Sequence, residues 1–215
     1  MVPTASHHLR PLADLISAAV LGAIPVKRPD AASVTRRIVR ATHLPEKVGW
    51  IDTLESDGVE PGDDTGETEA FDATPALDKA TVRAGDVLLV ARGARMRVAV
   101  AGPGVEGAVA SANLMLLRPV PDVLLGAALA WWLVSPEGEA ALAHANRGST
   151  LIPSMSVRDV LAIQVPVPPL AVQRHLAELL ETWSTTARAV RRASEARARL
   201  AFATACAALR GEVAP

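Results

Sequence analysis

The stretch from Leu170 to Leu209 contains neither proline nor glycine. Alanine, arginine, leucine and glutamate dominate it, and these residues favour helix. A helix of about 40 residues extends about 60 Å, since each residue adds about 1.5 Å. A domain built from the remaining residues cannot cover so long a helix. We therefore expect the helix to pair with another one, either from the same chain or from a second chain.

Apolar residues recur along this stretch at intervals of three or four positions, which is typical of a helix-pairing seam. The seam residues are Leu176, Leu179, Trp183, Val190, Ala193 and Leu200. The heptad is imperfect, because Arg197 falls near the seam. The sequence predicts a dimerisation or spacer helix over residues 169–210 that pairs as a coiled coil.

The preceding residues, 1–168, are predicted to form one α+β domain with a mixed sheet and short helices. Strand-forming patterns occupy residues 34–39, 49–51, 87–91, 95–101 and 108–118. Helical patterns occupy residues 8–21, 124–133 and 137–145. Ser135, followed by a proline, is suited to cap the last of these, and Ser156 to cap a further short helix. The proline-rich residues 165–169 are expected to interrupt regular structure and form a stiff hinge.

Gly102, Gly104 and Gly107 match the spacing of a dinucleotide-binding loop. Such a loop opens a helix, whereas a strand-like run follows here and Pro103 stands among the glycines. The pattern therefore favours a hairpin turn.

Charge is distributed unevenly, although the net charge is -1. Nine of the 23 acidic residues lie between Asp52 and Asp72, where there is no Lys or Arg, so the other 14 stand against 22 basic residues. A basic surplus is the usual footprint of phosphate contacts. The acidic segment, about residues 52–72, is interpreted as a passive loop, with a DNA mimic or docking surface as the alternative.

Several classes of site find no support in the sequence. A single cysteine, Cys206, excludes an internal disulfide, and the five histidines show no metal-ligand spacing, so no metal is expected. We find no cofactor loop and no motif for a flipped base, and therefore expect no cofactor and no catalytic residues. The longest apolar run is too short to span a membrane, and a cytoplasmic location is expected.

The order of several short motifs resembles the type I restriction-modification specificity subunits. The resemblance begins at Gly85-Asp86-Val87-Leu88-Leu89, closed by Arg92-Gly93, and continues through residues 110–119. It includes Gly148-Ser149-Thr150, Ile152-Pro153, Ser156-Val157 and Asp159-Val160. Its most specific part is the proline-rich junction with a glutamine-arginine start, residues 165–174.

This resemblance implies a non-catalytic subunit that reads double-stranded DNA. In such a family the globular domain reads half of a split site, and the long helix sets the spacing and docks the methyltransferase subunits, with or without a restriction subunit. Family members usually carry two such domains and two such helices. The sequence resembles one half, so we expect a homodimer of half-subunits with antiparallel helices and a palindromic, interrupted target.

Base reading requires donors on loops and strand ends. The candidates for DNA contact are Arg36, Arg37, Arg40, Arg92, Arg95, Arg97, Ser111, Asn113, Arg147, Ser149 and Thr150.

Other functions stay open at this point. The chain could serve another methylation-based phage-defence system, or exchange with a full-length specificity subunit. It could also be a coiled-coil adaptor that does not read DNA, or, least favoured, an enzyme such as a nuclease.

Overall fold

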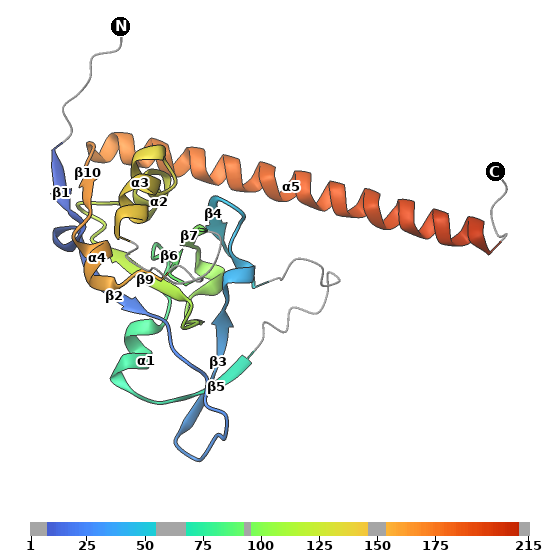
Figure 1. Ribbon diagram of the computed structural model, residues 1–215, viewed down its shortest axis with the longest axis horizontal. Helices are drawn as coiled ribbons and strands as arrows, with labels where there is room; N and C mark the ends of the chain where they lie inside the picture. The colour runs from blue at the N-terminus through green and yellow to red at the C-terminus, as the bar shows by residue number, and fades with distance from the viewer. Residues whose placement is uncertain (1–7, 55–67, 93–95, 146–153, 211–215) are drawn as a thin grey trace, which may run out of the picture.

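The computed structural model describes residues 8–54, 68–92, 96–145 and 154–210. These residues form an α+β lobe with mixed sheets, from which one long helix projects (Figure 1). The fold class expected from the sequence is confirmed. The division into domains 1–168 and 169–210 stays a prediction.

A five-stranded sheet lies at the centre of the lobe, with strand order β2-β9-β6-β7-β4. Its strands are β2 (Ile16–Leu21), β4 (Val48–Ile51), β6 (Val87–Val90), β7 (Val98–Ala101) and β9 (Leu114–Pro119). β4 runs parallel to β7, whereas the other neighbours are antiparallel, so the sheet is mixed. β6 is buried on both faces, because Val87 and Leu89 point to one apolar cluster and Leu88 and Val90 to another.

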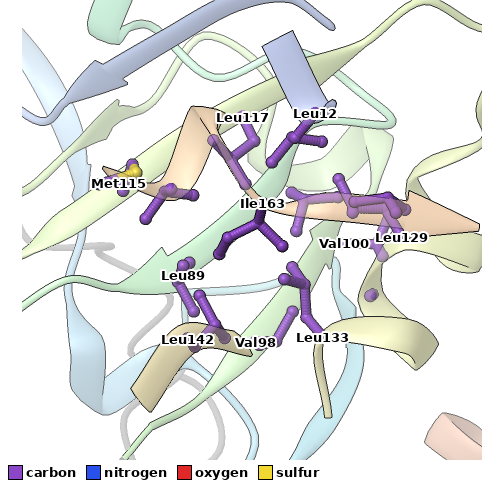
Figure 2. Close-up of a cluster of buried hydrophobic side chains, with 14 of the residues drawn as sticks. Leu12, Leu89, Val98, Val100, Met115, Leu117, Leu129, Leu133, Leu142 and Ile163 are labelled. Atoms are coloured by element: carbon purple, nitrogen blue, oxygen red, sulfur yellow. The ribbon is translucent and has the colours of Figure 1, made fainter. Parts of the chain in front are cut away.

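Three helices cover one face of this sheet: α2 (Gly126–Leu133), α3 (Pro136–Ala145) and α4 (Val157–Leu161). Figure 2 shows the cluster between them, where Leu89, Val98 and Met115 from the sheet lie near Leu129 and Leu142 from the helices. The predicted caps are confirmed: the Ser135 hydroxyl accepts from the Gly138 amide at 3.1 Å and the Ser156 hydroxyl from the Asp159 amide at 3.1 Å.

A three-stranded sheet of order β5-β3-β8 lies beside the central one. It consists of β3 (Ser33–Val39), β5 (Thr68–Asp72) and β8 (Val109–Ala110), and α1 (Pro75–Ala80) packs near it. Short 3₁₀ helices span Leu12–Asp14, Ala41–His43 and Pro103–Val105.

The predicted opening helix over residues 8–21 is wrong. The segment instead forms β1 (Leu9–Pro11), a 3₁₀ turn and β2. Ile16–Leu21 pairs antiparallel with β9, about a hundred residues further along the chain. Long-range sheet pairing thus outweighs a local spacing that is compatible with a helix.

Three further local predictions need correction. The glycine-rich segment after β7 does turn, but it is not a hairpin, because β8 pairs in parallel with β3 and not with β7. The predicted strand over residues 108–118 is accordingly split into β8 and β9. The hinge at 165–169 is partly structured, since β10 (Gln164–Pro166) pairs with β1.

The long helix α5 spans Leu170–Leu209, as the lack of proline and glycine predicts. It begins against the lobe and extends far beyond it (Figure 1).

Candidate nucleic-acid interface and projecting helix

Gln173 joins α5 to the lobe. Its side chain is fully buried. The side-chain carbonyl accepts from the Leu125 amide at 2.7 Å, and the side-chain amide donates to the carbonyls of Val123 at 3.0 Å and Pro168 at 2.8 Å. Three directional bonds on one buried residue fix both the position and the rotation of the helix where it leaves the lobe.

A second anchor lies three turns further along α5. The Ser184 hydroxyl accepts from the Trp50 amide of edge strand β4 at 2.9 Å and donates to the Leu180 carbonyl at 2.6 Å. A Cβ on Gly49 would stand 3.0 Å from the same hydroxyl oxygen. The glycine thus permits the helix to cover the edge of the sheet.

Trp131 of α2 supports the helix between these anchors. Its indole N–H donates to the Leu176 carbonyl at 3.1 Å, and its ring meets that of Trp183 edge-on with 6.5 Å between centroids. Together these contacts make the direction of α5 a fixed property of the lobe.

Beyond Ser184, α5 buries no described residue. About 25 residues, extending about 38 Å, therefore project from the lobe (Figure 1). Four seam residues are large and exposed: Leu179, Trp183, Val190 and Leu200 have exposed fractions between 46% and 69%. Ala193 is also exposed, whereas Leu176 is half-buried against the core of the lobe.

Two of the candidate DNA-contacting residues lie together at the end of β6. Arg92 and Asn113 are exposed, and the Asn113 carbonyl accepts from the amides of Ala91 at 2.9 Å and Arg92 at 3.3 Å. Ser154 forms an isolated bridge with Arg92. An exposed arginine and an exposed asparagine are thereby joined through the backbone just beyond the end of β6, an arrangement suited to reaching a groove or a phosphate.

The three candidate arginines of the second sheet lie on and after β3. The Arg36 side chain is exposed, and its guanidinium donates to the carbonyl of the neighbouring Thr35 at 3.0 Å. The Arg37 guanidinium donates to the carbonyls of Gly104 and Glu106, and that of Arg40 pairs with the Glu69 carboxylate at 2.7 Å. These cations form a second basic group, on a different sheet from Arg92.

Two other candidates are turned inward. The Arg97 guanidinium donates to the carbonyls of Ala41 at 3.3 Å and Leu44 at 3.1 Å. Ser111 is buried, and its backbone connects with Val39 and Leu114. Both residues shape the framework around the exposed candidates. The remaining four, Arg95, Arg147, Ser149 and Thr150, lie outside the described residues, as does most of the acidic segment.

Sequence reasoning missed a buried ion pair at the start of β6, the end of the strand opposite Arg92. The Asp86 carboxylate receives the Arg118 guanidinium through two bonds of 2.8 and 2.7 Å and also accepts from the Arg83 amide. The pair joins the start of β6 to β9. The sequence does contain a signal for the turn before Asp86, the dipeptide Gly85-Asp86. Gly85 has a φ of 87°, a backbone conformation that favours glycine.

Within the described ranges, no cluster of three or more His, Cys, Asp or Glu side chains could hold a metal ion. In the same part of the chain, none of the helices combines the length and hydrophobicity that crossing a membrane requires.

Comparison with known proteins identifies solved structures that are similar to this one. No protein-family model matches the chain, and no curated protein matches it. The crystal structure of the HsdS subunit from Thermoanaerobacter tengcongensis matches 95% of this chain with a TM-score of 0.58 and 19% identity. A structure from work on complex assembly and conformational transition of the type I R-M system matches 99% of the chain, also with a TM-score of 0.58 and 19% identity.

The chain spans about half the length of these proteins, since the matches cover 49% of each. The match includes the projecting helix as well as the lobe, because it extends over nearly the whole chain. The chain therefore has the fold of one half of an HsdS subunit.

Proposed function

We propose that this protein is a non-catalytic DNA-recognition subunit of a type I-like restriction-modification system. In this proposal it reads one half of a bipartite site and directs a partner adenine methyltransferase to it, with or without a restriction subunit, in the cytoplasm. The observation that carries the proposal is the match of both lobe and helix to half of an HsdS subunit.

The division of the molecule supports this role. A lobe can read only a short stretch of sequence, whereas a bipartite site requires two lobes at a fixed separation. The anchors at Gln173 and Ser184 hold α5 rigidly enough to set such a separation. The exposed pair Arg92 and Asn113, and the arginines of β3, are the described candidates for DNA contact.

Homodimerisation through α5 belongs to the same proposal. The exposed apolar residues of the projecting helix supply a surface for a second copy. Sedimentation of the purified protein at micromolar concentration, alone and with its methyltransferase, measures this part. A monomer under both conditions contradicts the homodimer.

Sequencing of methylated bases in the host genome, with and without the gene, tests the main proposal. We expect a split motif that is methylated only when the gene is present. An unchanged methylation pattern, combined with no salt-dependent DNA binding by the complex, would leave the non-DNA adaptor as the better reading of the projecting helix. The identity of the adjacent genes would distinguish a type I-like system from another methylation-based defence system.

A further inference from the structure

The connection between β2 and β3, residues 22–32, is an exposed segment that contains none of the DNA-contact candidates named from the sequence. It extends from the lobe on the side away from α5, at the lower end of the lobe in Figure 1. β2 and β4 are opposite edges of the central sheet, and α5 covers the β4 edge. The helix therefore leaves residues 22–32, which we call the arm, accessible.

The first residues of the arm are fixed to the strand end that presents Asn113. The Gly22 amide donates to the Leu114 carbonyl at 2.9 Å, and the Ala23 amide donates to the Ala110 carbonyl at 2.8 Å. A Cβ on Gly22 would collide with the Ala110 carbonyl, so this close crossing of two backbones requires glycine. The arm thus begins directly beside an exposed DNA-contact candidate.

The rest of the arm is held at two further points. The Val26 amide donates to the Ala70 carbonyl of β5 at 2.8 Å. At the far end, the Asp30 carboxylate accepts from the Ala32 amide at 2.9 Å and from the Ser33 hydroxyl at 3.2 Å. These bonds lower the pKa of Asp30 below its ordinary value, the Ala32 amide having the largest effect. The arm is therefore largely ordered before any partner binds.

Between these anchor points the arm exposes one large apolar side chain and two cations. Ile24 is 77% exposed, and Lys27 and Arg28 are exposed as well. Pro25 and Pro29 restrict the backbone on either side of the cations, so less conformational entropy is lost on binding. A lone exposed isoleucine is ordinary on a protein surface. This one, however, lies on a stiff segment between a candidate DNA-contacting strand end and a pair of cations.

The charges around the arm also favour an anionic partner. The arm, β3 with the residue that follows it, and β5 carry five cations and three carboxylates: Lys27, Arg28, Arg36, Arg37 and Arg40 against Asp30, Glu69 and Asp72. Two of the carboxylates are engaged within the protein, since Asp30 closes the turn of the arm and Glu69 pairs with Arg40 at 2.7 Å.

Duplex DNA offers both kinds of group that such an arm can bind. Its phosphates attract the cations. In the major groove, thymine presents a methyl group that apolar side chains contact. This groove is about 12 Å wide and admits two adjacent chain segments, whereas the minor groove is only about 6 Å wide.

We propose that the arm enters the major groove beside the bases reached from the Arg92 and Asn113 strand end. There Ile24 contacts a thymine methyl group, and Lys27 and Arg28 contact the flanking phosphates. This inference rests on the proposed function and names a specificity-determining residue for it. Because the arm is fixed to the lobe, it reads thymine at one set position of the half-site.

Removal of single thymine methyl groups tests the contact of Ile24. The complex of this chain with its methyltransferase is titrated with the cognate duplex and with duplexes in which deoxyuridine replaces each thymidine in turn. We expect one replacement in a half-site to weaken binding about fourfold, which corresponds to the roughly 0.8 kcal/mol of one buried CH₂ group. Ile24→Ala should bind the unmodified duplex more weakly and should not respond to that replacement.

Leu9→Ala is the matched control, because Leu9 is also exposed, at 62%, but lies on β1. It should bind as the wild type does and keep the full response to deoxyuridine. Both variants remove an exposed side chain, so neither should change the urea midpoint of the lobe.

The two cations are tested by the salt dependence of binding. Lys27→Gln and Arg28→Gln should each reduce the slope of log affinity against log salt concentration by about 1, on cognate and scrambled duplexes alike. Arg174→Gln, at an exposed position of α5, is the control and should leave the slope unchanged. Unchanged slopes for both arm variants contradict the phosphate contacts.

Several results overturn the inference while leaving the proposed function intact. One is a cognate half-site without thymine, and another is wild-type binding that no deoxyuridine weakens. A third is an equal response of the wild type and Ile24→Ala to every replacement. Loss of the methyltransferase from purified Ile24→Ala would assign the arm to a protein partner instead. A wild-type complex with no salt-dependent DNA binding would contradict the proposed function itself.

Discussion

The side-chain carbonyl of Gln173 accepts the backbone amide of Leu125 at 2.7 Å, across 48 residues of sequence. This bond connects the first turn of the projecting helix to the residue before α2. Together with the two bonds that the Gln173 amide donates, it makes the direction of α5 dependent on one buried polar side chain.

Replacement of this residue tests that dependence. Gln173→Leu keeps the approximate size of the side chain but removes its carbonyl, so the Leu125 amide loses its hydrogen-bond acceptor. We expect the free energy of unfolding to fall by at least about 2 kcal/mol, since an unsatisfied buried polar group costs about 1 to 3 kcal/mol. Urea denaturation measures the change. Arg174→Leu, at the exposed neighbouring position, is the control and should change stability by less than about 0.5 kcal/mol.

The close approach of β4 and α5 predicts non-additive mutations. In Gly49→Ala the new Cβ would stand 3.0 Å from the Ser184 oxygen and 3.3 Å from a Pro45 carbon. We expect a destabilisation of about 1 to 3 kcal/mol from this overpacking. Ser184→Ala removes the oxygen but also the Trp50 hydrogen bond, at a cost of about 1 kcal/mol. The double variant should lose less than the sum of the two single ones, and simple additivity in a double-mutant cycle would show that the contact carries no strain.

The buried ion pair of Asp86 and Arg118 should contribute far more to stability than the exposed pair of Arg40 and Glu69. The Asp86 side chain is only 2% exposed, whereas both partners of the other pair are more than a third exposed. Asp86→Ala leaves an uncompensated buried guanidinium, so we expect a loss of about 3 to 5 kcal/mol. Glu69→Ala should cost at most about 1 kcal/mol. Similar thermal midpoints for the two variants would refute this ranking.

The local sequence determined some elements of this fold and not others. The helix α5 was predictable to within one residue at each end, because 40 positions without proline or glycine leave few alternatives. The strands β6 and β9 and the caps at Ser135 and Ser156 were also visible, since their signals are local. The segment 8–21 was mispredicted, because its partner β9 is remote in sequence and only that pairing decides between helix and strand.

The same distinction explains what could be predicted of the candidate site. The apolar seam of α5 follows from periodicity alone. The anchors could not be found in this way, since Gln173 and Ser184 bond with residues 48 to 134 positions away. Among the arginines, composition gives no means of separating the exposed Arg92 from the inward-facing Arg97, because their environments arise from tertiary contacts.

Val190 provides a test of dimerisation that does not disturb the lobe. It is 64% exposed on the projecting part of α5. Val190→Glu places a carboxylate on the exposed apolar side of α5 that is proposed to contact a second copy, and we expect the dimer dissociation constant to rise by at least tenfold. The urea midpoint of the lobe itself should not change. Analytical ultracentrifugation measures the first quantity, and an unaltered dissociation constant would exclude this side of the helix from the interface.

Arg92 and Arg97 differ in the way their loss should affect DNA binding. Arg92 is exposed at the end of β6, so Arg92→Ala should leave stability unchanged and weaken binding of the assembled complex to its methylated motif. A base contact predicts a loss of about 1 to 3 kcal/mol of binding free energy on the cognate site alone, whereas a phosphate contact predicts weaker binding to all sequences and a smaller salt dependence.

Arg97→Ala should instead lower stability, because the guanidinium holds the carbonyls of Ala41 and Leu44. Fluorescence anisotropy over a salt series, with cognate and scrambled duplexes, distinguishes these outcomes. Unchanged affinity and an unchanged methylation pattern for Arg92→Ala would remove this residue from the DNA-contacting surface.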